Sequence, residues 1–301
     1  MISSLAKRLS NKSPRAIAAA LRWRFTRPWH LFRVRNAPEY ASPTAQDLAQ
    51  VEADLRALGV PLTDYHADLE RFGEFSKTAG FPADYHGGVH GGVYREKLLE
   101  HFVAWDLLAL QRDGRRVPYI DIASAASPWA NLLRIRGVEA YSIDLDRNSR
   151  FAHLDYYLQG DATASPFDRA SVGSASLQCA FEMFESDADM RLVAELARIL
   201  RPGGRAVISP LYMHTHACSY QSPEYFGRRQ PDEGAVAYVR RSASRVPSSR
   251  KYSAATLLSR VWKPALAQGL RPSLHVLRNA ATVGGEVYLH FILVLDKDER
   301  T

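Results

Sequence analysis

The sequence has few cysteines and no long apolar run, and these absences exclude several classes of protein. Cys179 and Cys218 are the only two cysteines in 301 residues, which is too few for a disulfide framework or a zinc cluster. No apolar stretch approaches the roughly 18 residues that a membrane-spanning helix needs. Apolar residues make up 46% and charged residues 24% of the chain, as in a globular cytoplasmic protein with reduced thiols, which is what we expect.

Acidic residues are absent from the first 37 positions, which carry nine lysines and arginines. The remaining chain holds 30 basic and 32 acidic side chains, so the net charge of +7 comes from this basic arm, residues 1–37. Its mixture of Arg with Trp, Phe and Leu is typical of an amphipathic helix on an anionic membrane surface. A basic helix packed on its own domain and a cleaved transit peptide are the alternatives. Nucleic acid is not an expected partner, because the basic charge is confined to the arm.

Glycine is missing where nucleotide-binding αβ domains normally have most of it. Residues 117–133, VPYIDIASAASPWANLL, have the pattern of a buried strand, a tight loop and a helix, and the loop holds alanine and serine. A nicotinamide-dependent oxidoreductase needs a Gly-x-Gly-x-x-Gly loop for the pyrophosphate, so that function is disfavoured. Alanine keeps the loop small but restricts the left-handed backbone that glycine adopts freely. Ser127 and Pro128 are good residues to begin the helix that follows.

Short apolar strands alternate with helices after residue 117, which predicts a mostly parallel α/β sheet. Strands are expected within residues 117–123, 139–146, 156–162, 174–181 and 205–213, with helices over 128–137 and 188–200. Two further strands, within 271–279 and 286–297, are close enough in sequence to form an antiparallel hairpin. Residues 38–80 have helical periodicity, whereas residues 211–252 lose periodicity and look like an insertion.

Three acidic residues lie near the ends of three successive predicted strands, where a doubly wound sheet binds its ligand. They are Asp121, Asp144 and Asp161. An acid at the second position typically binds the two ribose hydroxyls of a nucleoside cofactor. Three acids disfavour a phosphate chain and suit a ligand with an amine, hydroxyls and a cationic centre. Loop capping is the structural alternative for Asp121 and Asp161.

Residues 117–212 contain, in this order, the motifs YIDIASAAS, SIDLD, GDATASPFDRASVGSASLQCAFEMFE and LARILRPGGRAVIS. Together these motifs make the region resemble a class I S-adenosylmethionine-dependent methyltransferase of the small-molecule type. The resemblance implies a Rossmann-like doubly wound sheet of seven strands, mostly parallel with an antiparallel last strand, and S-adenosylmethionine as cofactor. With the charge and sequence patterns above, we expect three parts: the basic arm, a helical N-terminal cap or lid over 38–115, and a methyltransferase domain over 116–301 with an insertion at about 211–252.

The resemblance also implies roles for individual residues. Asp144 would bind the ribose hydroxyls, and Asp161 with Ala162 would contact the adenine amine. Gln178 or Ala180 would close the site near the methyl group. Asp121, Ala123 and Ser127 would line the methionine portion. The sequence departs from the family pattern at Ala123, Ala125 and Ser127, which replace glycines. It departs again at Glu182-Met183, where many members have Glu-His. We expect Met183 to pack in the core, and a position beside the cofactor sulfonium is the alternative.

Candidates for the acceptor side follow the fifth predicted strand. A hydroxyl acceptor needs a general base, and His214 or His216 stands near the expected methyl position. His-x-His followed by Cys218 is a weak metal signal, and no metal is expected. Basic residues cluster from Arg228 to Lys251. If they point inward the acceptor is anionic, and if they point outward they form a solvated face.

We therefore expect a methyltransferase acting on a small-molecule or glycan- or lipid-linked acceptor, with oxygen as the favoured target. The arm predicts peripheral membrane contact. The alternative is a degenerate protein of the same fold that binds no cofactor and serves as a membrane-associated scaffold or binding partner. The missing glycines motivate that alternative.

Overall fold

The computed structural model describes residues 25–88, 93–110, 117–125, 127–147, 149–284 and 287–299. The chain divides into two units. A small unit comprises residues 1–42 and 218–249, and a sheet unit comprises residues 43–217 and 250–301. Most of the basic arm, residues 1–24, and the glycine-rich residues 89–92 of the predicted lid lie outside the described residues.

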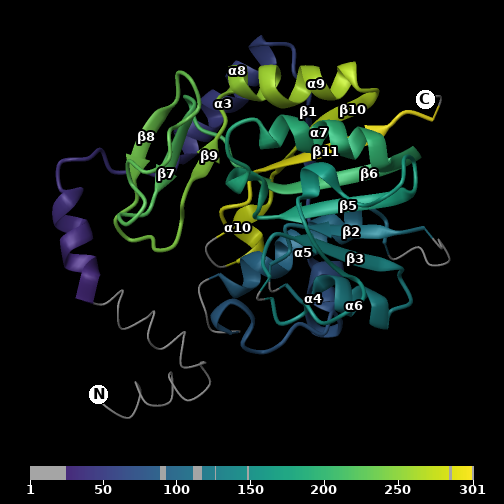
Figure 1. The fold of residues 1–301 in the computed structure, drawn as a ribbon. Coiled ribbons are helices and arrows are strands. Elements are labelled where there is room, and N and C mark those ends of the chain that lie inside the picture. The colour runs from purple at the N-terminus through teal and green to yellow at the C-terminus, as the bar shows by residue number, and fades with distance from the viewer. Residues whose placement is uncertain are drawn as a thin grey trace. The chain divides into compact units, whose positions relative to one another are not determined.

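Within the described residues, the sheet unit is built on eight strands in the order β1-β10-β11-β6-β5-β2-β3-β4 (Figure 1). They are β1 (Leu62–Tyr65), β2 (Tyr119–Ile122), β3 (Ala140–Asp144), β4 (Tyr157–Gln159), β5 (Val172–Gln178), β6 (Leu200–Leu211), β10 (Leu270–Leu277) and β11 (Phe291–Lys297). Strands β2 to β6 pair in parallel, and β11 is antiparallel to both β6 and β10. The Rossmann-like, mostly parallel fold and the C-terminal hairpin are confirmed, but the sheet has eight strands instead of seven.

The additional strand lies in the segment predicted to be entirely helical. Helix α3 (Ala45–Ala57) begins at a Thr44 capping box, and Gly59 follows it with φ of +78°. The chain then extends as β1, which pairs in parallel with β10, placing Leu62 opposite Leu274. The helical prediction is wrong for residues 62–65. This short strand is stabilised by backbone pairing with a strand that is distant in the sequence. The periodicity of neighbouring residues contains no information about such pairing.

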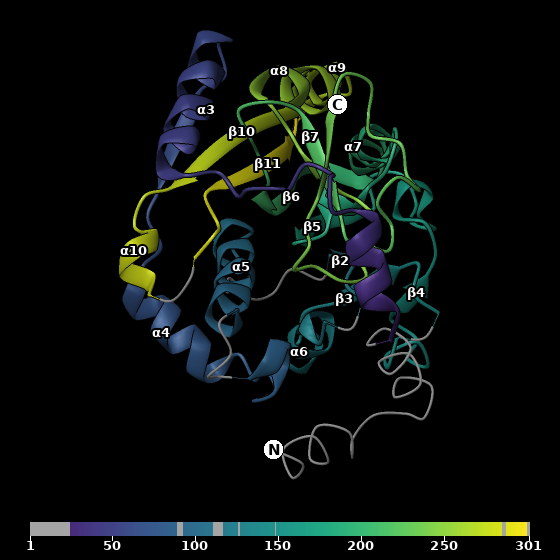
Figure 2. The ribbon, with the colours of Figure 1, turned by 90° about the vertical axis from the view of Figure 1, so that its left-hand side faces the viewer.

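Helices cover both faces of the sheet, because alternate strand residues point to opposite sides. Ile120 and Ile122 pack with α3, α7 (Ala188–Ile199), α8 (Ala254–Leu257) and α9 (Lys263–Ala267), the last two joined by a π-helical turn (Leu258–Trp262). Tyr119 and Val207 pack with α4 (Leu69–Thr78), α5 (Tyr94–Leu107), α6 (Trp129–Ile135) and α10 (Ala280–Val283). Figure 2 shows α5 and α6 on one side of the strands and α7 on the other.

Short elements complete the two units. In the sheet unit, 3₁₀ turns η1 (Tyr85–Gly87), η2 (Ala162–Ala164) and η3 (Phe181–Met183) follow α4, β4 and β5. In the small unit, residues 25–33 are helical and β7 (Cys218–Gln221) pairs in parallel with β8 (Val236–Val239). Strand β9 (Ser249–Lys251) runs across the boundary between the units. Among the described residues, no helix is both long and apolar enough to cross a membrane.

A buried acid at the start of α7 connects this helix to residues in and after β9. Its replacement tests how much these contacts stabilise the fold. The Asp189 carboxylate is fully buried, accepts from the Tyr252 hydroxyl at 2.7 Å, and pairs with Arg250 at 3.0 Å and Arg260 at 2.6 Å. Asp189→Asn should lower the free energy of unfolding by about 3–5 kcal/mol, because it leaves two guanidinium groups without their charge partner. Urea unfolding measures this.

The control is Asp187→Asn, two residues away, whose side chain is 63% exposed and pairs only at the surface with Arg191. It should change the free energy of unfolding by no more than about 0.5 kcal/mol. Equal unfolding midpoints for the Asp189 variant and the parent protein would contradict the structural role of this ion-pair cluster.

Candidate functional site

A cavity of about 580 Å³ lies at the carboxyl ends of β2 and β5. Three segments supply its described lining. The end of β2 and the loop after it contribute Asp121, Ile122, Ala123, Ser124, Ala125 and Ser127. The end of β5 and the next residue contribute Gln178 and Cys179, and the chain around η1 and α5 contributes Pro82, Asp84, Tyr85, His86, Lys97, Glu100 and His101. Arg150 also belongs to the lining. This is the edge at which a doubly wound sheet binds its ligands.

The loop after β2 keeps a glycine-type backbone although it contains no glycine. Ala123 has φ of +54° and Ala125 has φ of +47°, both in the left-handed region that costs an L-residue about 1–2 kcal/mol. Hydrogen bonds hold the loop in place. The Ala123 amide donates to the Ile143 carbonyl at 2.8 Å, and the Ser149 hydroxyl donates to the Ala125 carbonyl at 2.8 Å. Ala123 and Ala125 therefore adopt the left-handed backbone that glycine adopts freely, at a cost in strain.

Asp144, at the end of β3, organises the loop directly. Its Oδ2 accepts from the Ala125 amide at 2.7 Å, and its Oδ1 accepts from the Asp146 amide at 2.7 Å. Each carboxylate oxygen has about two lone-pair sites, so both oxygens keep acceptor capacity for a ligand. The residue predicted to bind ribose thus also anchors the strained turn.

Asp121 is a buried acid whose side chain lacks a donor. It is 1% exposed, and its Oδ2 has no hydrogen-bond partner among the described residues. Burial, together with the nearby Asp144 carboxylate, raises the pKa of Asp121 well above its ordinary value. Leaving a buried acceptor unpaired costs about 1–3 kcal/mol. A ligand amine in the cavity would offset that cost.

The other predicted cofactor residues divide into two groups. Ser127 and Gln178 line the cavity, and the Gln178 amide donates to Ser176 Oγ at 2.6 Å. Asp161 instead caps η2 by accepting from the Thr163 amide at 2.9 Å, and Ala162 is buried beside it. Neither is among the described lining residues. Their contact with adenine stays a prediction.

The two predicted bases lie together after β6. The ring centroids of His214 and His216 are 4.4 Å apart, and Thr215 Oγ1 lies 3.2 Å and 3.3 Å from their Nδ1 atoms. Neither histidine is among the described residues that line the cavity, so their catalytic role stays a prediction. The expectation for Met183 is wrong: it is 39% exposed, because η3 turns its side chain outward while Glu182 is buried.

Several members of the arginine cluster already have partners within their own units. In the sheet unit, Arg250 donates to the Phe184 and Ser186 carbonyls and pairs with Asp189. In the small unit, Arg241 pairs with Glu39 and donates to the Ala37 carbonyl. These pairings give no support to the anionic acceptor that the cluster suggested.

Titratable residues on α5 form the part of the site that sequence analysis missed. Lys97 Nζ lies 2.8 Å and 3.0 Å from the two Glu100 oxygens, and the Tyr288 hydroxyl donates to Glu100 Oε1 at 3.0 Å. Burial raises the pKa of Glu100 to about 7, against the opposing effect of Lys97 and Tyr288. Burial alone would lower the pKa of Lys97, but the Glu100 carboxylate raises it.

Burial also shifts the pKa values of His101 and Cys179, two further lining residues of the cavity. His101 Nε2 lies 3.0 Å from the Tyr85 hydroxyl, and burial lowers the pKa of His101 well below its ordinary value. Burial, followed by the charges of Glu182 and Glu100, raises the pKa of Cys179 to about 12. At neutral pH the cavity therefore contains a neutral imidazole and a thiol.

A sequence signal for this cluster was available. The stretch REKLLEH places Glu96, Lys97, Glu100 and His101 within two turns of a helix, among apolar residues. An apolar-striped helix normally turns such side chains to solvent, whereas α5 is buried on all sides from Glu96 to Ala104. Four buried titratable groups in succession point to a functional site.

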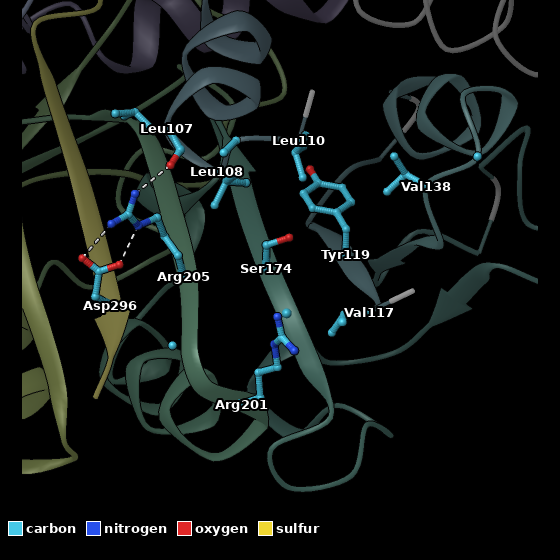
Figure 3. Close-up of a pocket in the computed structure, with 14 residues that line it drawn as sticks. Leu107, Leu108, Leu110, Val117, Tyr119, Val138, Ser174, Arg201, Arg205 and Asp296 are labelled. Atoms are coloured by element: carbon cyan, nitrogen blue, oxygen red, sulfur yellow. Dashed lines mark hydrogen bonds and ion pairs between the residues drawn. The ribbon is translucent and has the colours of Figure 1, made fainter. Parts of the chain in front are cut away.

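A second cavity, of about 300 Å³, lies at the opposite edge of the sheet. Figure 3 shows Arg205 bonded to both Asp296 and the Leu107 carbonyl, so this charge is already compensated. The lining reaches Leu110 and Val117, on either side of residues 111–116, which the structure does not describe. Because ligands of doubly wound sheets bind at the carboxyl ends of the strands, we assign the site to the larger cavity.

The comparison with protein families agrees with the motifs. Residues 106–208, about a third of the chain, match the family model described as a methyltransferase domain. This match confirms the resemblance of the central region to S-adenosylmethionine-dependent methyltransferases. No curated protein matches the chain in sequence.

Solved structures with similar chains include two small-molecule methyltransferases. The 1,6-didemethyltoxoflavin-N1-methyltransferase of Burkholderia thailandensis is 12% identical, with 87% of this chain and 94% of that chain covered and a TM-score of 0.45. The sugar N-methyltransferase of a Streptoalloteichus species is 18% identical, with 66% and 87% covered and a TM-score of 0.44. A chain in the Haloferax volcanii complex of the Trm112 activator and a putative methyltransferase is 16% identical, with 68% of this chain and 95% of that chain covered and a TM-score of 0.40.

The strained loop generates a stability prediction. Ala123→Gly and Ala125→Gly should each raise the free energy of unfolding by about 0.5–1 kcal/mol, because relief of the left-handed strain exceeds the added entropy of an unfolded glycine. Thermal unfolding measures the shift. Ala53→Gly is the control, because Ala53 is exposed within α3. It should be destabilising by about 1 kcal/mol. Destabilisation by both loop variants would show that the alanines are not strained.

Proposed function

We propose that this protein is an S-adenosylmethionine-dependent methyltransferase that methylates a small molecule, with oxygen as the methylated atom. The observation that carries the proposal is Asp121, a buried carboxylate with an unpaired oxygen in the cavity at the carboxyl ends of the strands. The match of residues 106–208 to a methyltransferase domain supports the same conclusion.

The residues present fit this cofactor. Asp121 would accept from the amine of the methionine portion, and the small side chains of Ala123 and Ala125 leave the loop backbone close to the cavity. Asp144 would accept the ribose hydroxyls on its remaining lone pairs while it holds the Ala125 amide.

The chemistry asks little of the protein beyond alignment and exclusion of water. When bound, the cofactor supplies an electrophilic methyl group on a sulfonium centre. The described residues around η1 and α5 and the ends of β2 and β5 would enclose that centre, and such enclosure strengthens electrostatic interactions. Gln178, fixed by its bond to Ser176, would border the methyl group.

Calorimetric titration with S-adenosylhomocysteine is the direct test of the cofactor. We expect binding, and no binding of NAD. Asp144→Ala should weaken binding about tenfold or more, because it removes a charged acceptor of ribose hydroxyls and the anchor of the Ala125 amide. The matched control is Glu139→Ala, an exposed acid just before the opposite end of β3, which should bind as the parent does. Absence of binding by the folded parent protein would favour the scaffold alternative.

We also propose peripheral membrane contact through the described end of the basic arm. Phe25, Trp29 and Phe32 are spaced four and three residues apart in the helical segment 25–33, and are 80%, 58% and 64% exposed. Arg33 and Arg35 stack on Trp29 and Phe32. Exposed aromatics flanked by cations are complementary to the interface of an anionic bilayer.

Sedimentation with lipid vesicles tests the membrane contact. The parent should bind phosphatidylcholine vesicles containing phosphatidylserine, and added salt should weaken binding. Combined Phe25→Ser, Trp29→Ser and Phe32→Ser should reduce binding about tenfold or more, because three aromatic side chains no longer enter the interface. Leu266→Ser, at an exposed position of the sheet unit, is the control. Equal binding by parent and triple variant would overturn this proposal.

A further inference from the structure

Two buried acids line the cavity, and the cofactor explains only one of them. Asp121 and the loop after β2 are assigned to the methionine portion. Lys97, Glu100 and Cys179 line the same cavity from α5 and the end of β5. The Gln178 position, expected to border the methyl group, directly precedes Cys179. The lining from α5 is therefore where an acceptor would meet the methyl group.

We propose that Glu100 lies in the methyl-acceptor subsite and takes the proton of a hydroxyl group on an uncharged small-molecule acceptor. This inference rests on the proposed function and goes beyond it by naming the base and the acceptor class. In the transfer, a lone pair of the acceptor oxygen forms the new O–C bond. The C–S bond breaks with its electron pair going to sulfur, and the hydroxyl proton passes to the Glu100 carboxylate.

The other described lining groups are less suited to this role. Lys97 carries a proton already, and the raised pKa of Cys179, about 12, keeps it a thiol. Tyr85 lies against His101, and burial raises the pKa of its hydroxyl and lowers that of the imidazole. Glu100 alone among the described lining residues combines full burial, a fixed orientation and a pKa of about 7.

Two donors fix the orientation of the Glu100 carboxylate. Lys97 Nζ contacts both oxygens, and the Tyr288 hydroxyl contacts Oε1. Lys97 and Glu100 together are neutral, so a charged acceptor would bring an uncompensated charge into the buried site. An uncharged hydroxyl adds none and can donate its proton to the remaining lone pair, on Glu100 Oε2.

Other titratable groups also influence Glu100. On its own helix these are Glu96 and Lys97. From the elements packed against α5 they are Tyr288, Tyr212, Glu182, Cys179 and Tyr85. Burial raises the pKa of Glu96 to about 8, and Glu96 is not among the described lining residues of the cavity. It therefore serves as the control for a charge on the same helix outside the subsite.

Sinefungin tests the position of Glu100 without knowledge of the acceptor. Sinefungin resembles the cofactor but has an amine at the position of the methyl sulfonium. The protonated amine is a cation, so a carboxylate in the acceptor subsite should increase the affinity for sinefungin. S-adenosylhomocysteine has a neutral thioether there. The ratio of the two affinities, measured by calorimetry, isolates the interaction because every other contact is shared.

We expect the parent to prefer sinefungin at pH 8. Glu100→Gln should reduce that preference about 10-fold to 100-fold while leaving S-adenosylhomocysteine binding unchanged, because a charged hydrogen bond is lost. Glu96→Gln should keep the preference. An unchanged ratio in Glu100→Gln, or an equal loss in Glu96→Gln, would overturn the proposal.

The pH dependence of the parent protein provides a measurement that needs no Glu100 variant. The preference for sinefungin should shrink between pH 8 and pH 6, because Glu100 becomes protonated as the pH falls through its raised pKa. Tyr288→Phe should move this transition to higher pH, since the Tyr288 hydroxyl lowers the pKa of Glu100. A constant ratio across this range would overturn the proposal. Absence of binding of both ligands would instead overturn the proposed function, and this inference with it.

Discussion

The hydrogen bond from the Ala125 amide to Asp144 Oδ2, at 2.7 Å, is the interaction on which the candidate site depends. It joins the loop after β2 to the end of β3 and holds an alanine in a conformation that glycine normally adopts. Alanines stand where the family pattern has glycines, and a hydrogen bond from the end of β3 holds this part of the loop in place. The strain is local, and residues held in this way persist only when the surrounding structure over-determines them.

Two carboxylates in one cavity have separate environments, and this difference allows separate roles. Asp121 is buried with an unpaired oxygen, whereas Glu100 is buried with a lysine and a tyrosine hydroxyl as donors. The first has an acceptor oxygen with no donor among the described residues. The second is already oriented, and its pKa lies near neutrality. When two titratable groups have different pKa values because their environments differ, this difference is the usual basis for assigning acid–base roles.

Sequence patterns were sufficient for the central fold, because short apolar runs for β2, β3 and β5 alternate with helical patterns such as that of α7. The Pro-Gly-Gly motif, predicted to be a turn before the next strand, lies within the first residues of β6. They also located Asp121, Ala123, Ser127 and Gln178, which line the cavity. They missed β1, whose pairing partner β10 lies more than 200 residues away. They also missed Lys97 and Glu100. The helical pattern of residues 94–114 predicted an apolar stripe and did not show that α5 is buried on every side.

The Glu100 environment shows why such a site escapes local analysis. Tyr288, which donates to Glu100, is 188 residues further along the chain and stands just before β11. Strand β11 is held antiparallel between β6 and β10, and the Leu289 amide donates to Glu96 on the same helix. The C-terminal hairpin thus completes the sheet and also fixes the polar face of α5. The orientation of the proposed base is consequently set by the packing of the last strand, which no motif near α5 encodes.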